Sequence, residues 1–297
     1  EEAVDEYLRC FKLPGTIRAT CADYHAGAHL DLDHDAADAD KRIEAPLLVL
    51  WGGLGKRVYH FFKTDSTNRV ARELGHAGEP HGTIVLAEEQ TAGRGRAGRS
   101  WHSEKSSGIY LTVLLRPAIS PADAPLVTLL AGLAAREAIA EQTSLACDVR
   151  WPNDLLLGGK KVSGILTEMY AEPDQVKFVI VGIGVNVNHA KFPEELGPIA
   201  TSLRLATGKQ HSRLELLVKL LRALERHYNQ FLAEGAGPVL EEFARVSSYA
   251  RGKRVRISTA NETYVGTTAG LEANGLLRVE REDGRTAVVI SGDVSEA

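Results

Sequence analysis

The stretch that most constrains the fold is the apolar run of residues 178–188, Phe-Val-Ile-Val-Gly-Ile-Gly-Val-Asn-Val-Asn. A continuous apolar run of this kind is typical of a strand that is covered on both faces. Its two glycines, Gly182 and Gly184, would let a ligand or a neighbouring backbone come close. We therefore expect the main domain to be built around a buried sheet.

The segments around this run predict further strands and helices. Strands are expected at residues 57–63, 82–88, 108–115, 147–151, 155–157 and 161–170. Helices are expected after residue 68 and at about 122–142, 214–232 and 238–246. The Gly158-Gly159 pair between two apolar runs predicts a hairpin turn. Because strands and helices do not alternate strictly, we expect an α+β fold, with a mixed sheet packed on helices, rather than a doubly wound sheet.

The last fifty residues have a different pattern from the rest of the chain. Short strands are expected at residues 254–258, 263–271, 276–281 and 286–290, with turns at Asn274-Gly275 and Asp283-Gly284. Several short strands at this spacing predict a small β-barrel. The expected organisation is an N-terminal extension of unclear structure (1–56), a ligand-binding domain (57–246) and a small C-terminal domain (247–297).

The composition narrows the class of protein. The 297 residues are 44% hydrophobic and 25% charged, as in ordinary globular proteins, and the net charge of −4 argues against a general nucleic-acid binder. No apolar run approaches a membrane span, and the three cysteines show no metal or disulfide spacing, so we expect a cytoplasmic protein. Three histidines among aspartates, His25, His29 and His34, could hold a metal, but a polar lead-in segment is the favoured interpretation.

Residues 93–101 carry the motif Gly-Arg-Gly-Arg-Ala-Gly-Arg-Ser-Trp. Its first six residues match the dinucleotide fingerprint G-x-G-x-x-G, which must open a helix directly. Here no apolar stripe of helical period follows, and the next apolar run predicts a strand. We therefore expect a basic loop between two strands, whose arginines offer permanent cations to a carboxylate or phosphate. The alternative is a solvated basic loop without function. If the loop is functional, its arginines should gain their partners only when a ligand is present.

Two other polar clusters accompany the loop. Residues 64–68, Thr-Asp-Ser-Thr-Asn, precede a short amphipathic helix and are natural capping residues, which can also bind a polar ligand group. Trp151-Pro-Asn-Asp154 precedes the predicted hairpin, from which Lys161 can project.

Taken together, these motifs resemble those of the biotin–protein ligases over about residues 57–290. The matching segments are Ser66-Thr-Asn68, Gln90 to Arg99, Trp151-Pro-Asn-Asp154 with Lys161 to Leu166, and Gly182-Ile-Gly-Val-Asn186. The resemblance implies a class II synthetase-like catalytic domain, an SH3-like C-terminal domain, and the activity of a biotin–[acetyl-CoA-carboxylase] ligase. Such a ligase makes biotinyl-5′-AMP from biotin and ATP with Mg²⁺. It then transfers biotin to a lysine of a biotin carboxyl carrier domain.

The resemblance also implies roles for individual residues. Lys161 and Arg96 are the expected catalytic residues, and Lys161 would act on the biotin carboxyl and the α-phosphate. Biotin and the adenylate would be bound by Ser66, Thr67, Asn68, Gln90, Arg94, Gly95, Arg96, Trp101, Lys161 and Gly164. The triphosphate would be bound by Asn153, Asp154 and Asn186, with Mg²⁺ at Asp154 and no structural metal.

The sequence departs from the family in two places. Arg150 stands where the family usually has lysine, which puts the role of that position in doubt. Residues 1–56 show no winged helix, so we expect no DNA partner.

The chain could act as a monomer or a homodimer. The rival interpretations are a lipoate–protein ligase and a biotin-sensing repressor.

Overall fold

The computed structural model describes residues 54–55, 57–259 and 261–297. These residues all belong to one compact unit. The predictions made for residues 1–53, including the three histidines and the winged helix, lie outside the described residues.

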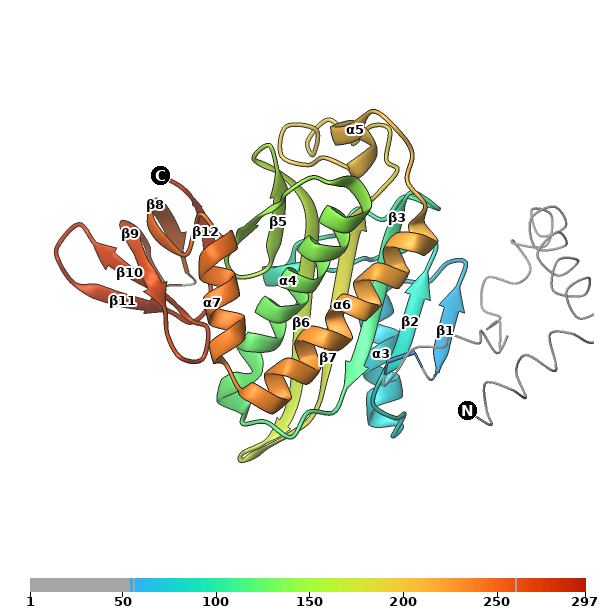
Figure 1. Cartoon of the computed structure of the whole chain (residues 1–297), viewed down its shortest axis with the longest axis horizontal. Coiled ribbons are helices and arrows are strands. Elements are labelled where there is room, and N and C mark those ends of the chain that lie inside the picture. The colour runs from blue at the N-terminus through green and yellow to red at the C-terminus, as the bar shows by residue number, and fades with distance from the viewer. Residues whose placement is uncertain (1–53, 56, 260) are drawn as a thin grey trace, which may run out of the picture. The chain divides into compact units, whose positions relative to one another are not determined.

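The main domain is built on a seven-stranded sheet with the strand order β1-β2-β3-β7-β6-β5-β4 (Figure 1). Its strands are β1 (Val58–Phe61), β2 (Thr83–Ala87), β3 (Gly108–Leu115), β4 (Asp148–Arg150), β5 (Asp154–Leu157), β6 (Lys160–Glu172) and β7 (Gln175–Asn186). β1 pairs with β2 in parallel and all other neighbours are antiparallel, so the predicted mixed sheet is confirmed. Gly158 and Gly159 both have positive φ in the predicted β5–β6 turn, a conformation that favours glycine.

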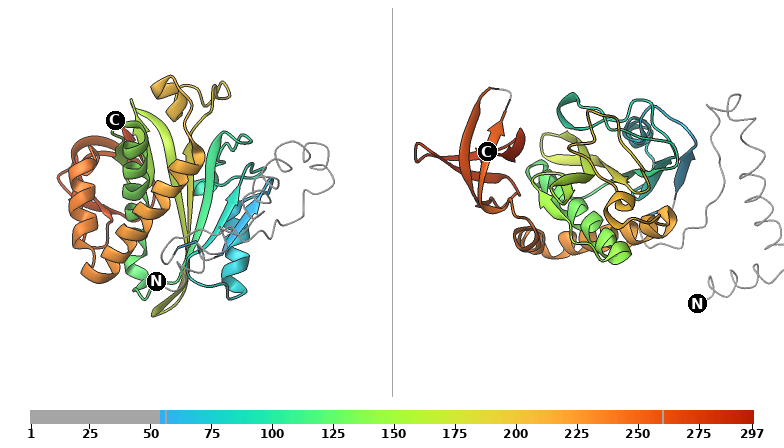
Figure 2. Two further views of the ribbon diagram at one scale, coloured as in Figure 1. Left: turned by 45° about the vertical axis from the view of Figure 1, so that its right-hand side comes forward. Right: turned by 90° about the horizontal axis from the view of Figure 1, so that it is seen from above.

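Helices lie on both faces of this sheet. They are α3 (Thr67–His76), α4 (Ala124–Thr143), α5 (Leu203–Thr207), α6 (Arg213–Glu234) and α7 (Gly237–Val246). α4 and α6 cover one face, whereas α3 packs against β2, β3 and β7 on the other, as Figures 1 and 2 show. The expected helices are confirmed, and α5 is an additional short one. None of the described helices combines the length and apolarity that crossing a membrane requires.

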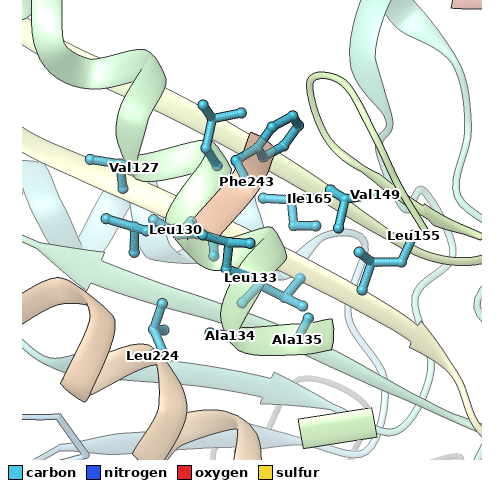
Figure 3. Packing of buried hydrophobic residues seen from close by; sticks show 14 of the residues in the cluster. Val127, Leu130, Leu133, Ala134, Ala135, Val149, Leu155, Ile165, Leu224 and Phe243 are labelled. Atoms are coloured by element: carbon cyan, nitrogen blue, oxygen red, sulfur yellow. The ribbon is translucent and has the colours of Figure 1, made fainter. Parts of the chain in front are cut away.

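The main core lies on the α4 side of the sheet (Figure 3). Leu130, Leu133 and Ala134 of α4 are almost fully buried, because α4 is apolar on nearly all sides and lies between the sheet and α6. Leu224 of α6 and Ile165 of β6 belong to the same cluster.

A second, smaller core joins α3 to the opposite face of the sheet. Val70, Ala71 and Leu74 of α3 pack on four strand residues. These are Val85, Leu114, Phe178 and Ile180. The α3 core uses only part of this face, and the rest is occupied by polar residues and glycines.

The C-terminal domain is a five-stranded antiparallel sheet with the order β11-β10-β9-β8-β12. Its strands are β8 (Arg251–Ser258), β9 (Thr263–Leu271), β10 (Leu277–Arg281), β11 (Thr286–Val289) and β12 (Asp293–Glu296). The four expected strands are confirmed. β12 was missed because Asp-Val-Ser-Glu contains a single apolar residue, which gives no alternating pattern to recognise.

Candidate active site

The strand β7 presents two different surfaces to the two sides of the sheet. Successive strand residues point to opposite faces. Val179, Val181, Ile183 and Val185 therefore enter the main core on the α4 side. On the α3 side the even-numbered positions begin with Phe178 and Ile180, in the smaller core, and continue with Gly182, Gly184 and Asn186. These last three line a cavity of about 390 Å³.

The cavity brings together every residue that the sequence analysis assigned to a ligand. Its lining includes Ser66, Thr67, Asn68, Gln90, Arg94, Gly95, Arg96, Trp101, Asn153, Asp154, Lys161, Gly164 and Asn186. These residues come from the start of α3, the β2–β3 loop, the start of β5, the β6 strand and the end of β7. A larger cleft of about 690 Å³ borders the same Gly-Arg segment and reaches Pro121, Met169 and Ile290.

Two glycines on neighbouring strands form the floor of the cavity. Gly164 of β6 and Gly184 of β7 are paired in register. A Cβ atom at Gly184 would overlap Cε2 of Trp101, and one at Gly164 would lie 3.0 Å from Cζ3 of the same ring. The Lys161 Nζ atom lies 5.3 Å from the centroid of this ring, within the range of a cation–π interaction. The glycines therefore make room for Trp101 and Lys161 to lie close to the sheet.

The start of α3 is held by Gln90. The backbone N–H and the hydroxyl of Thr67 donate to Oε1 of Gln90, at 2.8 and 3.1 Å. Nε2 of Gln90 in turn donates to the hydroxyl of Ser103 at 3.0 Å. Ser66 stands at the N-cap position, but its side chain makes no capping bond, so the simple capping interpretation does not account for it. Its buried hydroxyl lines the cavity at the positive end of the helix dipole.

Asn68 is held by partners within the protein. Its Nδ2 donates to Oε2 of Glu168 at 2.8 Å, and its Oδ1 accepts from the hydroxyl of Thr112 at 2.7 Å. Gly182 lies directly under this side chain, where a Cβ atom would overlap Oδ1. These bonds join α3 to β3 and β6. Glu168 and Thr112 were missed by the sequence analysis, because nothing in their local pattern distinguishes them from other strand residues.

The buried carboxylate of Asp154 forms ion pairs with two cationic side chains in the cavity wall. Asp154 Oδ1 lies 2.6 Å from Nζ of Lys161, and Oδ2 lies 2.6 Å from Nη2 of Arg150. Burial alone would raise the pKa of Asp154, but the charges and hydrogen bonds of Lys161 and Arg150 outweigh it and hold the pKa below its usual value. Arg150, whose role the sequence left open, therefore balances Asp154 together with Lys161.

A segment that the sequence analysis did not single out fixes the backbone of Lys161. Its N–H donates to the carbonyl of Ile199 at 2.8 Å, and its carbonyl accepts from the N–H of Thr201 at 2.9 Å. Nδ2 of Asn186 donates to the Thr201 carbonyl at 3.0 Å, which ties the same segment to the end of β7. Residues 192, 196 and 198–200 also line the cavity.

The Gly-Arg segment is a basic loop between β2 and β3, as predicted. It folds back on itself, because the N–H of Gly95 donates to the Arg99 carbonyl at 2.6 Å and that of Trp101 to the Gly93 carbonyl at 2.8 Å. Arg96 Nη1 lies 3.3 Å from Oδ1 of Asn153, and burial lowers the Arg96 pKa.

The expectation that the loop arginines gain partners only from a ligand is wrong for two of them. Arg99 forms an ion pair of 2.6 Å with Asp293, and Arg96 Nη1 lies 3.5 Å from the carbonyl oxygen of Gly292. Both partners belong to the C-terminal domain. The loop is therefore anchored to that domain by contacts within the protein.

The segments that form the cavity and the C-terminal β domain both match families of protein ligases. Residues 61–188 match the biotin/lipoate A/B protein ligase family, and residues 251–295 match the biotin protein ligase C-terminal domain. The chain belongs to the biotin protein ligase family, and its small domain is the SH3-like domain of that family.

Curated relatives and a solved structure support this assignment. The chain is 40% identical over 235 residues to the bifunctional ligase/repressor BirA of Bacillus subtilis, covering 78% of this chain and 71% of that protein. It is 37% identical over 271 residues to the biotin–[acetyl-CoA-carboxylase] ligase of Mycobacterium tuberculosis, covering 89% and 98%. The structure of the Aquifex aeolicus biotin protein ligase in complex with biotin and ATP aligns with a TM-score of 0.69 at 32% identity, covering 81% and 98%.

Proposed function

We propose that this chain activates biotin with ATP and transfers it to a specific lysine of a biotin carboxyl carrier domain of acetyl-CoA carboxylase. The observation that carries the proposal is the cavity itself, which places Lys161, Arg96 and the buried Asp154 around a glycine floor. The relatives named as biotin ligases give the substrate class.

In the first step an oxygen of the biotin carboxylate attacks the α-phosphorus of ATP. The new O–P bond gives biotinyl-5′-AMP, and the bond to the leaving pyrophosphate breaks. Both reactants are anionic, so fixed cations must offset their repulsion and the charge that develops at the phosphate. Lys161 and Arg96 are the catalytic residues proposed for this task. Asp154 and the backbone contacts of residues 199–201 position Lys161.

The biotin end of the cavity is proposed to lie between α3 and the glycine floor. Ser66 offers a hydroxyl that makes no capping hydrogen bond to α3. Thr67 and Gln90 form a fixed hydrogen-bonded pair beside it. Together they supply donors and acceptors for a ureido ring. Asn68 supports this wall by holding α3 in place. Gly164 would let the backbone close on the ligand, and Trp101 and Ile165 would cover its apolar parts.

The adenylate end is proposed to be formed by Arg94, Gly95 and Arg96 together with Asn153, Asp154 and Asn186. ATP arrives as its Mg²⁺ complex, in which phosphate oxygens and water together supply most of the metal ligands. Asp154, a buried carboxylate whose pKa is held below its usual value, would supply a carboxylate ligand to Mg²⁺.

In the second step the lysine amine of the carrier attacks the carbonyl carbon of biotinyl-5′-AMP. An amide bond forms, the bond to AMP breaks, and the amine loses a proton. Until then the intermediate must be shielded from water and from other amines. The Gly-Arg segment, anchored to the C-terminal domain through Arg99 and Asp293, is proposed to close the cavity during this interval. The chain is proposed to do this as a monomer or a homodimer.

Incubation of the protein with biotin, Mg-ATP and a carrier domain tests the proposal. The expected result is a mass increase of one biotinyl group on a single carrier lysine, together with biotin-dependent release of pyrophosphate. An unmodified carrier and no pyrophosphate, from a protein shown to be folded, would refute it.

The alternative substrate is lipoate, because the matched family includes lipoate ligases. A ligand that binds the folded state raises the melting temperature. We expect a shift with biotin and none with lipoate at the same concentration, and the reverse pattern would favour the alternative.

A further inference from the structure

We propose that His102, Glu104 and His189 form a second site, which binds one Zn²⁺ ion in the wall next to the ligand cavity. One imidazole nitrogen of each histidine and one carboxylate oxygen of Glu104 all lie within 4.8 Å of one another. Among residues 54–55, 57–259 and 261–297 this is the only such group of three metal-ligating side chains. The sequence analysis expected no structural metal and did not consider these residues, which extend over 87 positions along the chain, from 102 to 189.

Two segments that are distant in sequence bring these side chains together. His102 and Glu104 follow the Gly-Arg segment on the way into β3, whereas His189 follows the end of β7. The rings of His102 and His189 lie 5.9 Å apart between centroids, and Phe192 stacks on His189 at 5.1 Å with an interplanar angle of 14°. The stacking holds the orientation of the buried ring.

His189 has a buried nitrogen without a partner. Its side chain is fully buried, and no described residue makes a hydrogen bond to its Nδ1 atom. A neutral imidazole carries one N–H and one lone pair, so a fully buried ring of this kind has one nitrogen that needs a donor or a metal ion. A buried acceptor without a partner destabilises the folded state, and a metal ligated at this atom would remove that cost.

Tyr110 determines which nitrogen of His189 carries the proton. The hydroxyl of Tyr110 donates its one hydrogen to the carbonyl oxygen of Glu104 at 2.8 Å. Its oxygen lies 3.4 Å from Nε2 of His189 and can therefore only accept there. This arrangement selects the tautomer with a proton on Nε2 and a lone pair on Nδ1. A metal-binding histidine typically donates its other ring N–H to an oxygen in this way.

The donor set selects the kind of metal. Two imidazoles and one carboxylate are a common set for Zn²⁺, with the fourth tetrahedral position left to water. Mg²⁺ and Ca²⁺ prefer oxygen ligands throughout. Ligand atoms of a tetrahedral zinc site lie about 3.4 Å apart. Glu104 is exposed and His102 is half-buried, so both side chains have room to approach the buried His189 and close the remaining distances.

The position of the site joins it to the cavity. His102 directly follows Trp101, and both His102 and Phe192 line the cavity. A zinc ion at this place would link the segment that carries Trp101 to the segment after β7. The metal site depends on the positions of His102, Glu104 and His189 and not on the ligase activity.

Zinc titration of the purified full-length chain, monitored with a competing chromophoric chelator, tests the proposal. The chain also carries His25, His29 and His34, so the reference protein has all three replaced by alanine. We expect this reference to bind one Zn²⁺ per chain. His102→Ala and Glu104→Gln should each weaken binding by at least about 10- to 100-fold. Co²⁺ bound to the reference should show the ligand-field absorption of a tetrahedral site.

The matched control is His227→Ala. His227 lies 3.2 Å from a carboxylate oxygen of Glu137, but it belongs to no group of three ligands among the described residues. Its replacement should leave the zinc affinity unchanged. The proposal is overturned if the reference binds no zinc, or if His102→Ala binds it as tightly as the reference does. The readout is metal binding, so a failure here is distinguishable from a failure of ligase activity.

Discussion

The twelve residues of β7 alternate between two faces that serve different purposes. On the α4 side, Val179, Val181, Ile183 and Val185 are packed in the main core. On the α3 side, Gly182 and Gly184 offer no side chains, and the space they leave is used by Asn68 and Trp101. One face of the strand stabilises the fold, and the other makes room for a ligand.

The neighbouring strand β3 shows the same division. Ile109, Leu111 and Val113 enter the main core, whereas Thr112 bonds to Asn68 and Tyr110 lines the cavity. Substitutions on the α4 side should therefore change stability, and those at the cavity end of the α3 side should change ligand binding and catalysis. The predictions below test this separation, from the largest expected effect to the smallest.

The largest effect is expected from Lys161→Ala. Removal of a fixed cation from the adenylation site should lower the rate of biotin-dependent pyrophosphate release by about 100- to 1,000-fold, with the fold intact. The matched control is Lys160→Ala. Lys160 lies on the same hairpin as Lys161, but it is exposed and donates a hydrogen bond to the carbonyl of Gly197. Near-normal release by a folded Lys161→Ala protein would remove this residue from the mechanism.

The next largest effect separates two adjacent residues of β7. Gly184→Ala adds a Cβ that overlaps Trp101, so we expect biotin affinity to fall by about tenfold, or about 1.4 kcal/mol. Val185→Ala should instead lower the free energy of unfolding by about 2 kcal/mol and leave biotin affinity nearly unchanged.

Calorimetric titration with biotin and urea unfolding of both variants measure the two quantities. Gly197→Ala serves as the control for glycine replacement, because an added Cβ there would have no neighbour closer than 3.7 Å. Equal losses of affinity in Gly184→Ala and Val185→Ala would contradict the separation of the two faces.

An effect of similar size is expected for retention of the intermediate. Arg96→Gly removes a charged donor from the cavity and adds flexibility to its loop, so for each biotinyl-5′-AMP formed, bystander proteins should be acylated at least about tenfold more than with the unaltered chain. A blot of bystander protein incubated with the variant, biotin and Mg-ATP gives the measurement. Clean bystanders beside normal carrier modification would show that retention does not depend on Arg96.

The smallest effect concerns a carboxylate outside the cavity. Burial would raise the pKa of Glu88, but His60 and Arg213 lower it to about 2. Because the folded-state pKa lies below the unfolded value, Glu88 stabilises the fold above about pH 4.5, and this contribution is lost as the pH falls toward 2. Glu88→Gln should lower the free energy of unfolding at pH 7 by about 1 kcal/mol and flatten its pH dependence in that range.

Urea unfolding between pH 2 and pH 7 measures the contribution of Glu88. Biotin affinity should not change in Glu88→Gln, since this residue does not line the cavity. A pH dependence identical to that of the unaltered chain would show that the ion pairs of Glu88 contribute nothing to stability.

Much of the fold and of the site could be predicted, because short sequence patterns determine these elements locally. The run of residues 178–188 specifies a buried strand, and the Gly158-Gly159 turn specifies the hairpin that carries Lys161. The Gly-Arg loop between two strands was recognised from the absence of a helical stripe after it.

The remaining features depend on pairs that are distant in sequence. Glu168 bonds to Asn68 across 100 positions, and Asp293 pairs with Arg99 across 194 positions. Neither acidic residue differs in its local pattern from a solvated one, so no reading of periodicity could find it. The segment around Thr201 was missed for the same reason, because its role is to bond through its backbone to Lys161.

The most direct test of the account is a crystal structure of the protein with biotin and a non-hydrolysable ATP analogue. The account predicts that biotin occupies the cavity of about 390 Å³ and packs against Trp101, with the phosphates of the analogue between Lys161 and Arg96. Biotin in the larger cleft near Pro121 and Ile290 would contradict it.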